Sequence, residues 1–340
     1  VKGMKDIRSQ HSYLVTPLPN YPVTPSRFQT IPFEPKFTTF ALNPLKTMNH
    51  LKPKDTFFSD KHSLNFRGKL LDLRKPAIMG VLNVTDDSFF DGGKYTDKES
   101  IRLKINQMVV EGADIIDVGA MSTRPGSEPI HADLEIMRLE ESLELIRRDF
   151  PEIPISVDTC RPEVARRILQ ESEVDIINDI TAGGETEEMF SIVSEFRTAY
   201  IVMHMQGNPG TMQQNPEYTD VVDDILLFLA QKTYKLRKAG VTDIIIDPGF
   251  GFGKTLDHNY QLLAQLDIFR SLELPILAGL SRKSMIYRFL NLDPETSLNG
   301  TTALNMAALM KGCSILRVHD VKQAVETRDL FCKIRECSDL

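Results

Sequence analysis

The 340-residue sequence lacks several features that would place it in a common functional class. It has no tryptophan, and its few cysteines form neither a C-x-x-C pair nor a His/Cys cluster with zinc spacing. No apolar run approaches the roughly 20 residues of a membrane span. Basic residues number 40 against 47 acidic ones, so the basic excess typical of nucleic-acid binders is missing. We therefore expect a cytoplasmic protein with reduced thiols that binds neither nucleic acid nor membranes.

The first 60 residues differ in composition from the rest. The stretch LVTPLPNYPVTPSRFQTIPFEP is rich in proline and threonine and has no regular hydrophobic period. Because proline disfavours helix interiors and removes backbone donors, we expect residues 1–60 to form an extended or disordered arm. Within it, we expect residues 1–47 to be upstream sequence or an unstructured extension. The folded domain is predicted at 61–340.

Short apolar runs alternate with longer segments of helical periodicity from about residue 77 onward. Such runs are apolar almost throughout, as expected for parallel strands buried on both faces. They lie at 77–84, 114–120, 154–159, 175–180, 199–205, 243–249, 275–280 and 314–320. This alternation predicts a (β/α)₈ barrel. A doubly wound sheet is the alternative, but its glycine fingerprint is absent after the first strand.

Two further segments help to define the barrel. LNFRGKLLDL, at 64–73, alternates around Arg67 and Gly68 and predicts a β-hairpin that could cover the N-terminal end of the barrel. IIIDPGFGFGKT, at 244–255, resembles a phosphate-binding loop, but Pro248 stands where that motif needs its first glycine. The informative residue of this segment is therefore Asp247, at the end of the strand.

Polar side chains occur where every predicted strand ends, and in such barrels the chemistry sits at those ends. Any one of them could cap a helix or lie hydrogen-bonded in the core. Together they predict one polar mouth. The set is Asn83, Asp117, Arg124, Asp158, Asn178, His204, Asp247, Ser281 to Lys283, Arg317 and His319.

The types of these residues suggest two kinds of ligand. The carboxylates of Asp158 and Asp247 and the amide of Asn178 suit a flat heterocycle with several N–H donors. Two guanidinium groups and an imidazole, from Arg124, Arg317 and His319, suit phosphate or pyrophosphate. Asn83 could donate to that anion or ligate Mg²⁺. The long loops after the first two strands, which carry Phe89 and Phe90, are candidate lids.

The ordered motifs of residues 64–335 resemble the dihydropteroate synthase family, the folate-pathway enzymes that sulfonamides inhibit. The motifs are IMGVLNVTDDSFFDGG, DIIDVGAMSTRPGSEP, PISVDT, IINDI, VMHMQG, IIDPGFGFGKT, GLSRKS and RVHD. The resemblance implies that a dihydropterin-CH₂-pyrophosphate joins p-aminobenzoate and releases pyrophosphate, with Mg²⁺ as cofactor. It also implies a homodimer.

The resemblance also implies roles for individual residues. Catalysis would involve Asp158, Lys283, Asn83 and Arg317. The pterin would contact Asp158, Asn178, Met203, Asp247 and Lys283. The pyrophosphate would bind to Asn83, Arg124, Arg317 and His319. Asn83 would also ligate the metal. The p-aminobenzoate pocket would be formed by Phe89, Thr123, Pro125, Phe252 and Ser284.

One residue departs from the family pattern, and three other functions are possible. Asp86 stands where the family has proline in the first lid. A pterin-binding methyltransferase of the same barrel would keep Asp158, Asn178 and Asp247 but would not need Lys283 or the anion site. A zinc hydrolase would use His204 and His319 but lacks the expected His-x-His on the first strand. A non-catalytic pterin-binding homologue would not need the charged set.

Overall fold

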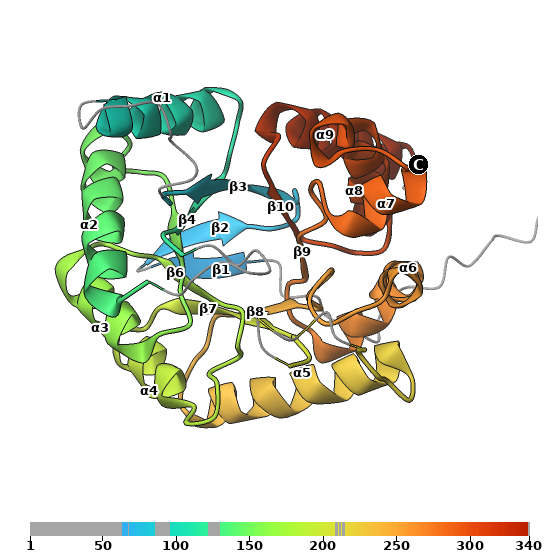
Figure 1. The fold of residues 1–340 in the computed structure, drawn as a ribbon, viewed down its shortest axis with the longest axis horizontal. Helices are drawn as coiled ribbons and strands as arrows, with labels where there is room; N and C mark the ends of the chain where they lie inside the picture. The colour runs from blue at the N-terminus through green and yellow to red at the C-terminus, as the bar shows by residue number, and fades with distance from the viewer. Residues whose placement is uncertain are drawn as a thin grey trace, which may run out of the picture. The chain divides into compact units, whose positions relative to one another are not determined.

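The structure is a computed structural model that describes residues 63–66, 68–85, 96–121, 130–207, 210, 212 and 215–338. The predicted arm at 1–60 lies outside these residues. Parallel strands form the centre of the described part (Figure 1). They are β3 (Ala77–Asn83), β4 (Ile115–Gly119), β5 (Ile155–Asp158), β6 (Ile176–Asp179), β7 (Ala199–Met203), β8 (Ile244–Asp247), β9 (Leu277–Ala278) and β10 (Ile315–Val318).

These strands close into a barrel. Their order is β8-β7-β6-β5-β4-β3-β10-β9, and a parallel bridge between Ile246 and Ile276 joins the two ends. The Ile246 N–H donates to the Pro275 carbonyl at 2.9 Å across the same seam. The strands form here because their runs are apolar and β-branched, and β4 and β8 are buried at every position. The predicted (β/α)₈ barrel is confirmed.

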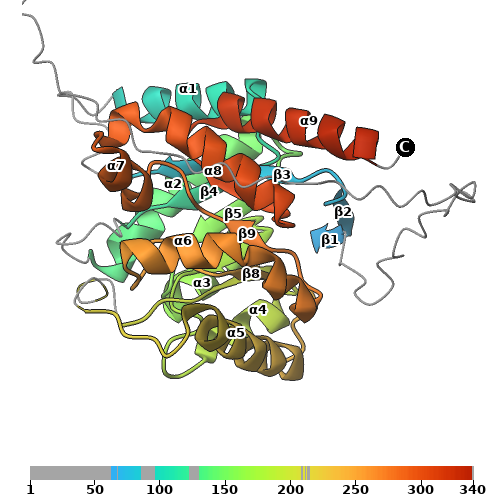
Figure 2. The same cartoon turned by 90° about the vertical axis from the view of Figure 1, so that its right-hand side faces the viewer.

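Helices surround the sheet in chain order (Figures 1 and 2). They are α1 (Thr96–Val110), α2 (Ala132–Asp149), α3 (Pro162–Glu171), α4 (Glu188–Glu195), α5 (Val221–Lys238), α6 (Leu256–Ala264), α7 (Ser284–Leu290), α8 (Leu298–Met310) and α9 (Val321–Ser338). Short 3₁₀ turns η2 (Leu266–Leu272) and η3 (Pro294–Thr296) follow α6 and α7. None of the helices in the described ranges is long and apolar enough to cross a bilayer.

Local sequence sets the helix ends. Helix α3 begins with Pro162, and the N–H that proline lacks would have no intrahelical partner at this position. The Asp220 side chain caps α5 by accepting from the N–H groups of Val222 and Asp223. Ala239 is the C-cap of α5. Gly240 follows it with φ +94°, a conformation that favours glycine.

A two-stranded hairpin covers the N-terminal end of the barrel. Strands β1 (Ser63–Phe66) and β2 (Lys69–Asp72) pair antiparallel, and Figure 2 shows them beyond one end of the parallel strands. Leu64, Phe66 and Leu73 are buried. They pack into one cluster with inward-facing residues near the strand starts: Ala77, Met79, Ile115, Ile176, Ala199, Ile201, Ile245, Leu277 and Ile315. The predicted hairpin and its position are confirmed, and ligands must reach the interior from the opposite end.

Candidate functional site

The barrel interior changes from apolar to charged along the strands. Inward-facing Ile115, Ile176, Ile245 and Ile315 lie in the apolar cluster beneath the mouth. Side chains two residues apart on a strand share a face, so the next inward positions on these strands are Asp117, Asn178, Asp247 and Arg317. Asp158 pairs in register with Asn178 and joins the same layer. The strands therefore place five of the sequence-predicted polar residues in one layer.

Arg317 joins the carboxylates of two other strands. Its Nε donates to Asp117 Oδ2 at 2.7 Å, and its Nη2 donates to Asp158 Oδ2 at 2.7 Å. Asn178 Nδ2 donates to the same Asp117 oxygen at 3.2 Å. The network thus connects β4, β5, β6 and β10. A guanidinium has five N–H donors, so Arg317 keeps donors for an anion while both carboxylates hold it.

Burial shifts the pKa of two acids in this layer, Asp158 and Asp247. Burial raises the pKa of Asp158 to about 7, although the neighbouring Arg317 charge lowers it. Burial also raises the pKa of Asp247 above its usual range, against the opposing effect of Lys283 and a hydrogen bond from the Gly249 N–H. Asp158 can therefore gain or lose a proton near neutral pH.

The loop after β8 carries the next part of the site. Asp247 Oδ1 accepts from the Gly249 N–H at 2.7 Å. Gly249 has φ +73°, and a Cβ there would lie 1.9 Å from the His204 carbonyl oxygen, so only glycine fits. Lys283 Nζ donates to the Phe250 carbonyl and lies 4.7 Å from the centre of the Phe252 ring. Burial lowers the pKa of Lys283 to about 8, against the opposing charge of Asp247.

Lys254, the residue that makes this loop resemble a phosphate-binding loop, points into the protein. Its Nζ donates to the carbonyls of Gly249 at 2.8 Å and Phe252 at 3.0 Å, and lies 3.1 Å from His204 Nδ1. It is 4 % exposed. Burial and the Lys254 charge lower the pKa of His204 to about 2, so this imidazole is neutral. Lys254 braces the loop, a role that the motif alone did not reveal.

His319 and Arg282 lie near the mouth but differ in availability. The Ser281 hydroxyl lies 3.2 Å from His319 Nδ1 and accepts from the His319 N–H at 3.2 Å. Burial and the Arg317 charge lower the pKa of His319 to about 4, so the imidazole can donate a hydrogen bond but carries no charge at neutral pH. Arg282 makes two bonds to Asp320, at 2.8 and 2.7 Å, which hold it beside the site.

The remaining predicted residues divide into two groups. Asn83 ends β3 and is exposed, and Met203 pairs in register with Asp247. Ser284 begins α7 and lines a cleft of about 440 Å³ together with Lys254, Thr255 and Arg288. Other predicted residues lie outside the described residues: Asp86, Phe89, Phe90, Thr123, Arg124 and Pro125.

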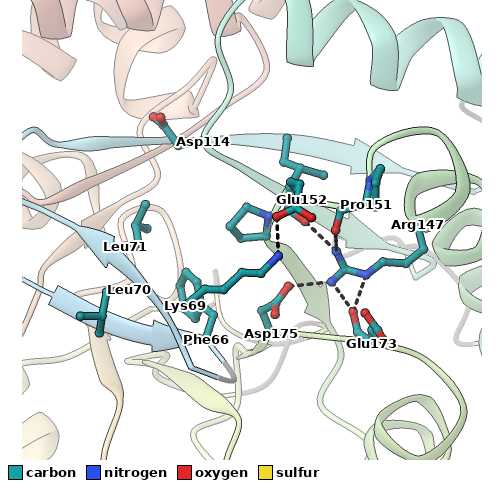
Figure 3. A pocket seen from close by; sticks show the side chains of 12 residues that line it. Phe66, Lys69, Leu70, Leu71, Asp114, Arg147, Pro151, Glu152, Glu173 and Asp175 are labelled. Atoms are coloured by element: carbon teal, nitrogen blue, oxygen red, sulfur yellow. Dashed lines mark hydrogen bonds and ion pairs between the residues drawn. The ribbon is translucent and has the colours of Figure 1, made fainter.

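A larger cavity, of about 530 Å³, is lined by the hairpin and by residues just before the strands, such as Asp114 and Asp175, and therefore lies at the end of the barrel opposite the mouth. Figure 3 shows its lining side chains. Its wall includes Phe66 and Leu71 of the hairpin. Its charged residues bond to one another or to backbone: Lys69 pairs with Glu152, and Arg147 donates to Asp175 Oδ2 at 2.7 Å (Figure 3). The Lys69–Glu152 pair links the hairpin to the loop after α2, whereas Arg147 and Asp175 link α2 to the start of β6.

Among the described residues, a Mg²⁺ ion would need ligands from the substrate as well as from the protein. Within the described ranges, no group of three or more His, Cys, Asp or Glu side chains could hold a metal ion. Mg²⁺ is commonly bound by one or two protein oxygens together with substrate phosphates. The exposed amide of Asn83 at the mouth fits that mode.

Comparison with known proteins gives one consistent result. A family model described as pterin binding enzyme matches residues 79–319. The chain is 44% identical over 262 residues to dihydropteroate synthase of Escherichia coli (strain K12), covering 76% of this chain and 92% of that protein. The identity is 42% over 255 residues for the Haemophilus influenzae synthase, covering 74% of this chain and 92% of that protein.

Solved structures give the same answer. The Yersinia pestis dihydropteroate synthase with a sulfonamide drug complex is similar with a TM-score of 0.75 and 38% identity, covering 81% of this chain and 99% of that one. The Xanthomonas albilineans synthase with 4-aminobenzoic acid is similar with a TM-score of 0.73 and 35% identity, covering 81% and 98%.

Proposed function

We propose how the barrel mouth of this chain, which belongs to the dihydropteroate synthase family of pterin-binding enzymes, carries out the family's reaction. The enzyme condenses 7,8-dihydropterin-CH₂-pyrophosphate with p-aminobenzoate to give 7,8-dihydropteroate and pyrophosphate. The observation that carries the proposal is the partly buried layer in which Arg317 joins Asp117 and Asp158 beside Asn178, above an apolar barrel floor.

The pterin lies on the inward-facing acids and amide. Asp247 and Asn178 accept hydrogen bonds from the amino-pyrimidine edge, because a carboxylate and an amide oxygen both accept from neighbouring N–H groups. Lys283, held beside the Phe252 ring, donates to pterin acceptors. Met203 lies next to Asp247 across β7 and β8 and supplies apolar contact. This arrangement selects a flat ring with donors along one edge.

Bond breaking precedes bond making. The C–O bond breaks and its electron pair leaves with the pyrophosphate, so positive charge develops on the pterin methylene and ring. The ionised Asp158 carboxylate stabilises that charge, as a preorganised group does in a site shielded from water. The amine of p-aminobenzoate then forms the C–N bond with its lone pair and releases a proton.

Arg317 and His319 hold the pyrophosphate leaving group. Arg317 has donors beyond those that bind Asp117 and Asp158, and the neutral His319 offers an N–H. Arg124 would supply a second guanidinium. Mg²⁺, held by the pyrophosphate and the Asn83 amide oxygen, would neutralise charge on the leaving group. Phe252 and Ser284 would contact p-aminobenzoate together with Phe89, Thr123 and Pro125.

The direct test measures both products at once. Purified protein is incubated with the pterin pyrophosphate, p-aminobenzoate and Mg²⁺, and pyrophosphate and dihydropteroate are quantified together. We expect equal amounts of both, and a fall in kcat of about 10²- to 10³-fold in Asp158→Asn, because the charge that stabilises the cation is lost. Pterin binding without either product would instead favour the methyl-transfer or binding-only homologue.

We also infer that the enzyme is a cytoplasmic homodimer. Large apolar side chains are exposed on and beside α7 and α8, among them Phe289, Leu290, Leu292 and Met310. Exposed apolar side chains can be covered by contact with a second chain, and a homodimer would cover these. Light scattering should give twice the mass of one chain, and charge substitutions at Phe289 and Met310 should halve it. A monomer in the wild-type protein would reject this inference.

A further inference from the structure

We propose that Asp117 is a positioning residue that fixes both Arg317 and the side-chain amide of Asn178. It thereby determines which hydrogen-bond donors and acceptors face the pterin. The inference deepens the function proposed above and rests on it. Asp117 lies at the centre of β4, a buried position that the proposed mechanism does not otherwise use.

One oxygen of Asp117 serves two residues of the site. Asp117 Oδ2 accepts from Arg317 Nε at 2.7 Å and from Asn178 Nδ2 at 3.2 Å. These donors come from β10 and β6, on either side of β4 in the barrel. A single carboxylate therefore sets the relative position of two side chains that reach the mouth from different strands.

The bond to Asn178 determines which end of its amide is free. A side-chain amide can rotate so that either its oxygen or its NH₂ group points in a given direction, and the hydrogen-bond partners decide between them. Because Asp117 can only accept, it holds the Asn178 NH₂ group and leaves the Asn178 oxygen directed elsewhere. An oxygen at that end accepts from a ring edge rich in N–H donors, whereas a reversed amide would oppose donor to donor.

The bond to Arg317 fixes the plane of its guanidinium. Asp117 holds Nε while Asp158 holds Nη2, at 2.7 Å each, so the group is fixed at two points. Two carboxylates on a planar fork leave little freedom of rotation. The remaining donors of Arg317 therefore have a fixed direction before any substrate binds.

Asp117 is expected to lower the stability of the fold at this position. Its side chain is fully buried, and within the described part of the chain its Oδ1 has no hydrogen-bond partner. A buried charge that is only partly satisfied destabilises a fold, and such exceptions concentrate at functional sites. An apolar residue would fill the same space without the free-energy penalty of burying a charge, so a role in the site explains the carboxylate.

The test compares Asp117→Asn with the wild-type enzyme. This variant keeps the shape and one acceptor but loses the charge, and its amide can adopt either orientation. We expect KM and the calorimetric Kd for the pterin pyrophosphate to rise about tenfold or more, with a much smaller change in KM for p-aminobenzoate.

A pH profile adds a readout that a merely structural role would not move. The charged groups that act on Asp158 are Arg317 of β10, Asp117 of β4, Asp179 of β6 and Glu135 of α2. Loss of the Asp117 charge removes one repulsion, so the acidic limb of kcat/KM should move to lower pH in Asp117→Asn.

Asp175→Asn is the matched control. Asp175 is also a buried acid paired with an arginine, Arg147, but it lies at the opposite end of the barrel (Figure 3). It should lower the melting temperature without changing either KM or the pH profile. If Asp117→Asn behaves as this control does, the inference is wrong.

A second variant covers the case in which Asp117→Asn does not fold. Asp117→Glu keeps the negative charge inside the barrel but moves the carboxylate by one methylene, so it should also raise KM for the pterin. A wild-type KM in a folded Asp117→Glu protein would overturn the proposal. An inactive wild-type enzyme would instead reject the proposed function, so the two failures are distinguishable.

Discussion

At the residue scale, burial brings two groups of opposite charge into the pH range of the reaction. The pKa of Asp158 rises to about 7 because burial disfavours the carboxylate, and the pKa of Lys283 falls to about 8 because burial disfavours the ammonium. The proposed mechanism needs both groups charged, the first to stabilise a cation and the second to donate to the pterin.

This pair predicts a bell-shaped dependence of kcat/KM on pH. Activity should rise as pH increases through about 7, where Asp158 loses its proton, and fall above about 8, where Lys283 loses its own. Steady-state rates from pH 5 to 10 measure both limbs. Lys283→Arg, whose guanidinium stays protonated throughout, should remove the alkaline limb. An unchanged alkaline limb in that variant would exclude Lys283 as its source.

A single glycine sets the turn after β8. In Gly249→Ala, the added Cβ would lie 1.9 Å from the His204 carbonyl oxygen, and φ is +73°. The backbone must move, so we expect the free energy of unfolding to fall by more than the ~1–3 kcal/mol of left-handed strain alone, with a clear loss of activity. Denaturant unfolding and kcat/KM measure both effects.

Gly68→Ala is the control for that variant. Gly68 also has a positive φ, +91°, but no atom lies within 4 Å of its Cβ position. In Gly68→Ala, the free energy of unfolding should fall only by the amount due to left-handed strain, and activity should be unchanged. Equal losses of stability in the two variants would mean that the contact with His204 is not decisive.

At the element scale, the β1–β2 hairpin should affect stability but not catalysis. Leu64 is fully buried against the strand starts, so Leu64→Ala should lower the free energy of unfolding by ~2–5 kcal/mol. The KM for both substrates should stay unchanged, because the polar mouth is at the other end. Leu70→Ala, at a side chain that is 73% exposed, should be nearly neutral. A raised KM in the Leu64 variant would show that the hairpin influences the site.

The elements themselves were predictable because their signals are local. Continuous β-branched runs indicated strands, a 3.6-residue period indicated helices, and Arg67-Gly68 between alternating segments indicated the hairpin. The polar layer followed from the barrel, since residues at strand ends in a closed barrel must share one mouth. The register then confirmed that Asp158 and Asn178 are neighbours.

The pairing of side chains within the layer was not predictable. The expected contact of Arg317 with a phosphate stays a prediction. The sequence did not indicate that Arg317 also bonds to Asp117, which lies 200 positions away. Lys254 follows the glycine-rich loop after β8, and the sharp turns of that loop direct its Nζ back to carbonyls of the same loop. Both outcomes depend on barrel closure and on backbone angles, which no local pattern contains.

At the scale of the whole molecule, the barrel should be sufficient for activity. The match to the Yersinia pestis structure covers 99% of that chain but only 81% of this one. The composition of residues 1–60 also predicts an arm outside the folded domain. A variant that begins at residue 61 should therefore keep kcat/KM within about twofold of the full chain and unfold with the same midpoint. A large loss of activity would assign residues 1–60 to the working enzyme.

The hairpin that covers the barrel floor has a kinetic consequence. Asp117, Asn178 and Asp247, which lie deepest, are buried, whereas Phe252 and Ser284 are partly exposed. In a recess closed at its inner end, the molecule that occupies the bottom must enter before the one above it and can leave only after it. Substrate addition should therefore be ordered, with the pterin first. In a rapid mixing experiment, enzyme preincubated with p-aminobenzoate should form product no faster after mixing with the pterin pyrophosphate than enzyme that was not preincubated.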